Sequence, residues 1–299
     1  MEEKKKEQDM KDSLIGLAQG EIVQRHGEAS SQILQAYKGI RVDHNGHLED
    51  FYGRNLKQIS EYNLGDNPDV SRKQQSGFSA ELIKESRDNK QAVINGESNR
   101  TRTTDGIGKT NDTQYDHVIV DENGNVQEGS GSQMKFLKSR TTENGQTKYN
   151  VIDKLAKDTS WDRYDGPVDI PSDQYEGAVR YAKEEAEKLE KQAAALREQG
   201  NIEKAKEIEE KAQRYRDAQK RVRDSGVSSA EALDARNNPE KFVAKEMLKS
   251  GHEAGVAAAK GTMIVSGVVS GVKNMCAVVA GEKDLDEAAV DVTKTVAKD

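Results

Sequence analysis

The feature that most constrains the fold is a seam of apolar residues that recurs at three- and four-residue steps from Tyr175 to Ala218. This spacing places the apolar side chains on one face of an α-helix, while charged residues fill the other faces. Gly200 and Asn201 interrupt the seam, which predicts a turn between two helices. We therefore expect a charged helical hairpin over residues 172–224, with a thin interface made by Tyr175, Ala178, Ala182, Ala186, Leu189, Ala193, Leu196, Ile202, Ala205, Ile208, Ala212, Tyr215 and Ala218.

The rest of the chain has limited material for a core. Of the 299 residues, 33% are hydrophobic, 5% are aromatic and 33% are charged, which argues against one large core and favours helices joined to a modest globular unit. We divide the chain into an N-terminal helical region (1–71), an α/β module (72–171), the hairpin (172–224) and C-terminal helices with a Gly/Ala/Val-rich segment (225–299).

Helix signals occur on both sides of the module. Apolar spacing predicts two helices between residues 13 and 38, a short helix from Leu56 to Tyr62, a loop over 63–71 and an amphipathic helix over 76–95. Capping-box spacing marks two further helix starts, at Asp173 with Glu176 and at Ser228 with Glu231. The pair Asn238-Pro239 begins the last predicted helix.

The strongest β signal lies between residues 117 and 137. His117–Val120 is rich in β-branched residues, Asp121–Asn125 contains an Asn-Gly turn, and extended character resumes over 126–137. We interpret residues 96–113 as a polar connection. The expected fold class is α+β: a small mixed sheet flanked by helices, followed by the long helical hairpin and further helices.

Four residues of the module form a candidate catalytic set. Glu81 belongs to the predicted helix over 76–95, and Asp116 stands at the head of the strand that begins at His117. Gln133 and Lys135 are two apart on the next extended segment, so their side chains point to the same side of the strand. An adjacent strand can bring Asp116 to the same edge.

This combination suits metal-assisted hydrolysis of a phosphodiester. Carboxylates are hard oxygen ligands for Mg²⁺ or Mn²⁺, and the metal polarises the phosphate and lowers the pKa of its bound water. Glu81 and Asp116 are the expected metal ligands, with the amide oxygen of Gln133 as a third. Lys135 is the expected catalytic lysine, which orients the nucleophile and offsets the charge that develops.

The order helix-Glu81, strand-Asp116, then Gln133-Met-Lys135 resembles the PD-(D/E)xK nuclease superfamily, in variants where Gln replaces the second acid. The resemblance covers about residues 74–138. It implies a restriction-endonuclease-like fold, with a mixed sheet flanked by helices. The implied activity is a Mg²⁺-dependent endonuclease that cuts DNA or, less often, RNA, in phage (antiviral) defence, a mobile element or a toxin.

The sequence departs from that pattern and leaves alternatives open. No proline precedes Asp116, Gln133 is a weaker ligand than a carboxylate, and Asp121 or Glu128 can replace one of the chosen ligands. Each residue also has a structural interpretation. Glu81 is one of several charges on its helix, Lys135 suits a strand edge, and Asp116 can cap the strand entry.

Positive charge around the module indicates a nucleic-acid surface, although the net charge of the chain is −7. A local basic groove is sufficient for contact with phosphates, because the charge near the phosphates determines binding. The residues expected to line this groove are Arg72, Lys73, Arg100, Arg102, Lys109, Lys138 and Arg140.

Other nucleotide and metal chemistries fit less well. A ββα-metal (HNH-type) nuclease needs a later His or Asn ligand on a helix, and no histidine lies between His117 and His252. The remaining histidines lack cysteine partners for a zinc site. The segment Gly106–Thr110 ends in Gly-Lys-Thr but lacks the upstream glycine of a Walker loop.

The C-terminal region supports a second hypothesis, a non-enzymatic interaction protein. The hairpin would then mediate homo-oligomer assembly, and residues 254–281 would dock on a membrane or a protein partner. This segment has too few consecutive apolar residues to span a membrane unaided, which takes about 20. A pore-forming or injected phage-type protein is a third hypothesis that rests on the same segment.

The first residues and the cysteine content indicate where in the cell the protein is expected. The first residues are charged and lack the apolar run of a signal peptide, and the lone Cys276 permits no intrachain disulfide. We expect a cytoplasmic protein, either free or peripheral to the inner face of a membrane.

Overall fold

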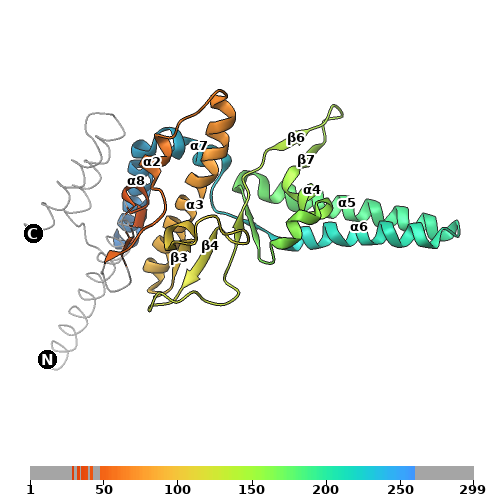
Figure 1. The fold of residues 1–299 in the computed structure, drawn as a ribbon, viewed down its shortest axis with the longest axis horizontal. Coiled ribbons are helices and arrows are strands. Elements are labelled where there is room, and N and C mark those ends of the chain that lie inside the picture. The colour runs from red at the N-terminus through yellow and green to blue at the C-terminus, as the bar shows by residue number, and fades with distance from the viewer. Residues whose placement is uncertain (1–28, 30–31, 34, 40, 43–47, 260–299) are drawn as a thin grey trace, which may run out of the picture.

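The computed structural model describes residues 29, 32–33, 35–39, 41–42 and 48–259, and Figure 1 shows their arrangement. Most of the helical residues predicted between 13 and 38 lie outside this part of the chain, as do Cys276 and the end of the Gly/Ala/Val-rich segment beyond Ala259. Among the described helices, none has both the length and the hydropathy needed to cross a membrane.

Helix α3 (Pro68–Asn95) lies between the C-terminal helices and the strands (Figure 1). Asn67 accepts a hydrogen bond from the backbone N–H of Val70, Pro68 occupies the first helical position, and Gly96 ends the helix at a φ of 72°. The helix therefore begins before the predicted Ser76, inside the expected loop over 63–71, because an Asn cap followed by Pro is a strong start signal.

The elements before α3 are short. The strands β1 (Arg41–Val42) and β2 (Leu48–Glu49) pair in antiparallel fashion. The short helix predicted from Leu56 is confirmed as α2 (Leu56–Ser60), and its capping box joins Asn55 and Gln58.

Two antiparallel strands cross the module beside α3. β3 (Arg100–Thr103) pairs with β4 (His117–Val120), and Thr103 lies opposite His117. β3 and the 3₁₀ turn η1 (Asp105–Ile107) lie in the segment that we expected to be an irregular connection. The turn predicted over Asp121–Asn125 is confirmed, since the N–H of Gly124 bonds to the carbonyl of Asp121 at 3.0 Å.

Three parallel strands continue the β structure. β5 (Gln133–Met134) pairs with β8 (Val168–Ile170), and β8 pairs with β9 (Val222–Asp224). An isolated antiparallel bridge between His117 and Ser132 connects this sheet to β4. The expected hairpin over 117–137 is therefore held by isolated bridges, and the regular partners of its two arms are β3 and β8.

A small hairpin and two short helices follow β5. The strands β6 (Ser139–Thr141) and β7 (Thr147–Tyr149) form a ribbon that projects from the body (Figure 1). It leads into helix α4 (Asn150–Lys157) and the 3₁₀ turn η2 (Thr159–Arg163).

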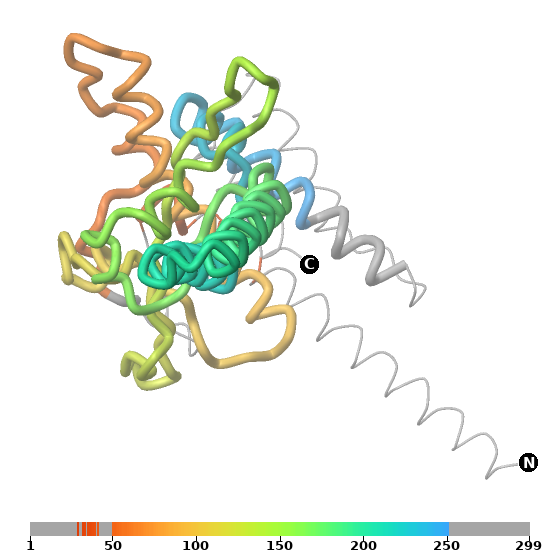
Figure 2. The backbone as a smooth tube through the Cα atoms, turned by 90° about the vertical axis from the view of Figure 1, so that its right-hand side faces the viewer, coloured from red at the N-terminus to blue at the C-terminus, as the bar shows by residue number. Residues whose placement is uncertain are grey.

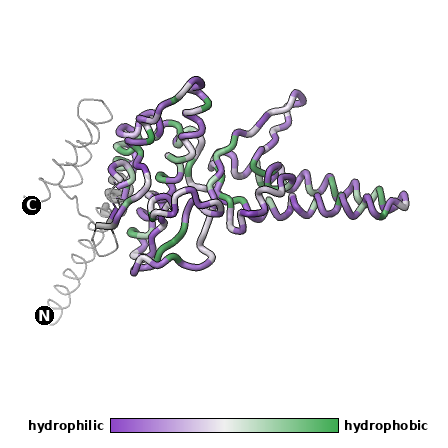
Figure 3. Tube along the Cα trace, viewed as in Figure 1, coloured by the Kyte–Doolittle hydropathy of each residue, from purple (hydrophilic) through white to green (hydrophobic). Residues whose placement is uncertain are grey.

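The predicted helical hairpin is confirmed as α5 (Ser172–Glu198) and α6 (Ile202–Arg221), which extend away from the body in Figure 1 and are seen nearly end-on in Figure 2. The hairpin is hydrophilic over most of its length (Figure 3). Its alanine seam is buried at Ala178, Ala182, Ala186, Ala193, Ala205, Ala212 and Ala218.

The predicted cap of the first hairpin helix is wrong. Pro171 occupies the capping position without a side-chain cap bond, and the Asp173 carboxylate instead accepts a hydrogen bond from the N–H of Ser229 at 2.7 Å.

Two hydrophobic cores lie on either side of the parallel strands. The first joins the two ends of the described chain: Ile33, Tyr37, Leu56, Ile83 and Met134 pack with Phe242 and Val243. The second joins α4, β8 and the bases of α5 and α6, and its members include Ile152, Leu155, Trp161, Val168, Ile170, Tyr181 and Tyr215.

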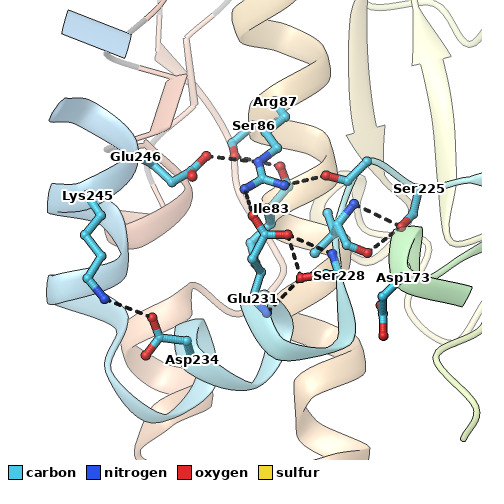
Figure 4. Close-up of polar contacts among 12 residues, drawn as sticks. Ile83, Ser86, Arg87, Asp173, Ser225, Ser228, Glu231, Asp234, Lys245 and Glu246 are labelled. Carbon is cyan, nitrogen blue, oxygen red and sulfur yellow. Dashed lines mark hydrogen bonds and ion pairs between the residues drawn. The ribbon is translucent and has the colours of Figure 1, made fainter. Parts of the chain in front are cut away.

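The last helices, α7 (Ser229–Asn237) and α8 (Pro239–Ala259), begin where the Ser228 cap and the pair Asn238-Pro239 predict, and α7 packs against both α3 and α8. Arg87 of α3 binds both helices, at 2.6 Å to Glu231 and 2.9 Å to Glu246, and also donates to the carbonyl of Gly226 (Figure 4). Glu231 at the same time closes the capping box of α7 with Ser228.

Candidate active site

Asp116 stands where the two sheets meet. Its backbone N–H and that of His117 both bond to the carbonyl of Ser132, at 2.8 and 3.0 Å. Its carboxylate accepts a hydrogen bond from the N–H of Met134 at 2.7 Å and another from the amide of Gln133. Asp116 is therefore fixed to β5 through both its backbone and its side chain.

The alternation expected for residues 133–135 places three side chains around the strand. Backbone bonds to Pro167 and Asp169 hold β5 against β8 at 3.0 and 2.9 Å. Met134 enters the first core, and the amide of Gln133 reaches Asp116. The ammonium of Lys135 lies 4.0 Å from the Asp116 carboxylate. The expectation that Asp116 comes to the edge that carries Gln133 and Lys135 therefore agrees with the structure.

Lys135 also has an aromatic neighbour. Its Nζ lies 5.0 Å from the centre of the Tyr164 ring, a distance that suits a cation–π interaction. The side chain keeps 22% of its exposure, so its ammonium is positioned but still reaches solvent.

Glu81 approaches this group from α3. Nε2 of His117 donates to the backbone carbonyl of Glu81 at 2.9 Å, which ties this turn of the helix to β4. Burial raises the pKa of the Glu81 carboxyl well above its ordinary value, and the nearby carboxylates of Asp116 and Asp105 raise it further, while Lys135 opposes them. Three of the four predicted catalytic residues, Asp116, Gln133 and Lys135, therefore lie together, and Glu81 is near enough to interact electrostatically with Asp116 and Lys135.

Asp116 experiences the same crowding. Burial raises the pKa of its carboxyl, and Lys135 together with the hydrogen bond from Met134 offsets only part of that rise. Two carboxyl groups with raised pKa values beside one lysine favour the arrival of further positive charge.

Asp105 is a member of the cluster that sequence reasoning missed. It begins η1, directly after β3, and its carboxylate accepts a hydrogen bond from the N–H of Asn111 at 3.1 Å. Asp105 and Glu81 line one small cavity of about 30 Å³, together with Thr103 and Phe51. The Arg-Thr-Arg-Thr run over 100–103 lacks the apolar–polar alternation that marks a strand, so no local signal in the sequence places Asp105 beside Glu81.

The site contains carboxylate and amide oxygens, the kind of ligand atom that Mg²⁺ and Mn²⁺ prefer. The amide oxygen of Gln133 is buried and has no hydrogen-bond partner within the described structure, and it belongs to the side chain that contacts Asp116. No cluster of three or more His, Cys, Asp or Glu side chains arranged to hold a metal occurs among the described residues. Magnesium sites commonly use only one or two protein carboxylates and fill the shell with water and phosphate oxygens.

The basic residues expected to bind nucleic acid occupy two kinds of environment. Arg100 and Arg102 are buried at 8% and 2% exposure and bond to backbone carbonyls of β3 and its approach, so they belong to the fold's interior. Arg72 pairs with Asp69 at 3.3 Å. The remaining predicted residues, Lys73, Lys109, Lys138 and Arg140, are exposed.

The alternative ligands named from the sequence make no hydrogen bond or ion pair with this cluster among the described residues. The Asp121 carboxylate accepts hydrogen bonds from Asn123 and Asn125 within its own turn, and Glu128 is exposed. Comparison with protein-family models, with curated proteins and with solved structures finds no match to this chain.

Proposed function

We propose that this chain is a metal-dependent nuclease that hydrolyses phosphodiester bonds with Asp116, Gln133, Lys135 and Glu81. The observation that supports the proposal most is the 4.0 Å approach of the Lys135 ammonium to the Asp116 carboxylate, from two different strands, with Glu81 beside them. Carboxyl groups with raised pKa values beside a lysine concentrate at functional sites, which supports a catalytic role over a purely structural one.

The proposed metal ligands are Glu81, Asp116 and the amide oxygen of Gln133. A bound Mg²⁺ or Mn²⁺ supplies charge for the phosphate and a water of lowered pKa. The unpartnered oxygen of Gln133 supports this assignment, because a buried amide oxygen without a hydrogen bond carries a desolvation cost that a cation removes.

Lys135 is the residue that acts on the reacting groups. Hydrolysis forms one P–O bond from water and breaks one P–O ester bond, leaving a phosphate monoester on one product and a hydroxyl on the other. The Lys135 ammonium donates a hydrogen bond to a non-bridging phosphate oxygen and offsets the negative charge that grows there. Asp116 and Tyr164 hold that ammonium in place.

The arrangement of elements is part of the proposal. The helix that carries Glu81 is followed by β3, β4 and β5, then by α4 and the parallel strand β8. The resemblance implies a mixed sheet flanked by helices, and we assign to that sheet the antiparallel pair β3 and β4 and the parallel strands β5, β8 and β9, which an isolated bridge joins.

A cleavage assay tests the proposal. Wild-type protein is incubated with supercoiled plasmid, linear duplex DNA or RNA, in Mg²⁺, Mn²⁺ or EDTA, beside Lys135→Ala and Asp116→Asn. We expect cleavage that needs the metal and falls by about 100-fold or more in each variant, the usual cost of removing a group that stabilises the transition state. Lys183→Ala, on the exposed surface of α5, is the matched control and keeps full activity.

Two outcomes contradict the proposal. Equal cleavage by wild type and both site variants identifies a contaminating nuclease. Folded wild-type protein that cuts none of the substrates favours the non-enzymatic interaction protein, in which the cluster is a degenerate site.

A further inference from the structure

The ribbon of β6 and β7 has a defined geometry. Arg140 lies opposite Lys148, and the pairs Ser139–Tyr149 and Thr141–Thr147 flank them. The turn closes through hydrogen bonds between Thr142 and Gln146 at 2.9 Å and has Gly145 at a φ of 76°, a conformation that suits glycine.

One face of the ribbon is anchored to the body. Tyr149 packs on Tyr181 with ring centres 5.9 Å apart, and its hydroxyl occupies the space that a Cβ at Gly177 would need. Because directly opposed residues share a face and neighbours along a strand alternate, Arg140 and Lys148 share the face opposite to Tyr149. Lys138, two residues before Arg140, belongs to that same cationic face.

The cationic face is costly for the isolated protein. Like charges directly opposite each other in an antiparallel pair destabilise it. Neither Arg140 nor Lys148 has a side-chain hydrogen bond or ion pair among the described contacts, and the sole acid in the sequence 138–149 is Glu143 in the turn. A polyanion placed on this face removes the repulsion.

A groove lies at the base of the ribbon and shares Lys138 with the cationic face. It has a volume of about 540 Å³, and its charged lining consists of Lys138, Lys154 and Lys157 with the acids Asp153 and Asp158. Lys154 and Lys157 each pair with an acid of α4 or the residue after it, at 3.2 Å to Asp158 and 2.7 Å to Asp153. Lys138 contributes its charge to the groove without such a pair among the described ion pairs.

We propose that the β6–β7 ribbon and this groove bind B-form duplex DNA, with the ribbon in the major groove and Arg140, Lys148 and Lys138 on the phosphates. The major groove of B-form DNA accepts a two-stranded β-ribbon, whereas that of A-form RNA is deep and narrow. Neither Lys148 nor the groove emerged from the sequence.

The position of the ribbon also constrains the substrate. Arg140 follows Lys135 by five residues, and five residues span at most about 17 Å even when fully extended. At about 3.4 Å per nucleotide along a strand, the ribbon contacts phosphates within roughly five nucleotides of the scissile bond. This spacing rests on the nuclease proposal above, whereas the binding itself does not.

Fluorescence anisotropy with a labelled duplex DNA in EDTA, over a range of salt concentrations, tests the binding without any cleavage. For Arg140→Ala/Lys148→Ala we expect about 10- to 60-fold weaker binding near 100 mM salt, and a slope of log affinity against log salt that is shallower by about 2. Lys191→Ala/Lys204→Ala, on the exposed faces of α5 and α6, is the matched control and binds as wild type does.

The double variant removes a like-charge pair from an exposed ribbon, so its fold is retained, which circular dichroism checks. Unchanged affinity of that variant overturns the proposal, as does a wild type that does not bind duplex DNA. Equal binding to duplex RNA with equal loss in the variant overturns the major-groove assignment. Wild type that binds DNA through the ribbon but never cuts it contradicts the nuclease proposal alone.

Discussion

Glu81 and Glu85 lie one turn apart on α3 and meet opposite electrostatic environments. Glu85 accepts a hydrogen bond from Arg41 at 2.6 Å and another from the N–H of Thr103 at 2.9 Å. Burial alone would raise the pKa of Glu85, but Arg41 and Arg102 outweigh it and lower that pKa. Burial and two neighbouring carboxylates instead raise the pKa of Glu81 well above its ordinary value.

The contrast separates carboxylates that hold the fold from carboxylates that are available for chemistry. Glu85 has its charge balanced by arginines and its oxygens filled by donors, which is how buried charge is normally accommodated. Glu81 has no arginine to balance it among the described residues, so the folded state disfavours its ionised form and raises its pKa, and such groups concentrate at functional sites. Substitutions at each kind of carboxylate test this distinction.

The largest expected effect is on stability at Glu85. Glu85→Ala leaves Arg41 and Arg102 buried without their carboxylate, and breaking a buried pair from one side costs about 3–5 kcal/mol. Urea unfolding measures this loss, and Glu81→Ala is the control, with little or no loss expected. Equal losses at the two positions would remove the distinction between them.

Asp153 extends the comparison to the second core. Its carboxylate accepts hydrogen bonds from Tyr181 at 3.0 Å and Tyr215 at 2.8 Å, and it raises the pKa of both tyrosines beyond the rise caused by their burial. Asp153→Ala removes both bonds and is expected to lower the free energy of unfolding by about 2 kcal/mol. Lys157→Ala removes only an exposed partner and should cost less than about 1 kcal/mol; the reverse order of these losses contradicts the assignment.

Added metal is expected to stabilise the protein through Glu81 and Asp116. A ligand at about ten times its dissociation constant raises the free energy of unfolding by about 1.4 kcal/mol. Thermal unfolding with and without Mg²⁺ should therefore show a shift in wild type that Glu81→Gln and Asp116→Asn lose. Glu128→Gln is the control and keeps the shift, because Glu128 is exposed and outside the cluster; loss of the shift in that variant would transfer the ligand role to Glu128.

The smallest effect is expected at Glu231, a partly exposed carboxylate whose charge is balanced by hydrogen-bond donors. Its burial raises the pKa, but hydrogen bonds from Arg87 and Ser228 prevail and lower it from 4.5 to about 2. A carboxyl group whose pKa is lowered by folding stabilises the folded state at pH values above its ordinary pKa. For Glu231 that contribution is lost as the pH falls from 4.5 toward 2.

Glu231→Gln should accordingly destabilise the protein at neutral pH by less than about 1 kcal/mol, because the carboxylate is 38% exposed and partly screened. Urea unfolding across that pH range measures whether the difference between variant and wild type shrinks on acidification. A difference that stays constant with pH would show that the ionised carboxylate is not what Arg87 and Ser228 stabilise.

Local patterns were sufficient to predict much of the fold. The alanine seam of the hairpin needs only helical periodicity, and the Ser228 capping box needs only neighbouring residues. β3 escaped prediction because its inward positions include Arg100 and Arg102, whose burial depends on partners elsewhere in the chain. The pairing of β8 with β5 on one side and β9 on the other joins segments far apart in the sequence and leaves no local signal.

The candidate site was likewise predicted only in part. Alternation along residues 133–135 predicted that Gln133 and Lys135 share one side of the strand, and the structure has both side chains next to Asp116. Asp105 enters the cluster only because β3 returns beside α3, so the sequence pattern over 96–113 gave no reason to include it. The burial of Arg100 and Arg102 likewise reduces the predicted basic surface.

The first core couples residues from opposite ends of the described chain. Tyr37 donates to Glu240 at 2.7 Å, and Leu56 shares the core with Val243, about 190 residues later. At about 5–20 residues per second, the ribosome needs roughly 10–40 s to synthesise the intervening chain. During that interval α3 lacks the two helices that Arg87 binds, so Leu56 and Ile83 lack the apolar residues that cover them in the folded protein. Folding of the nascent chain is therefore limited by its last helices, and a chain truncated before Phe242 lacks the residues that close its first core.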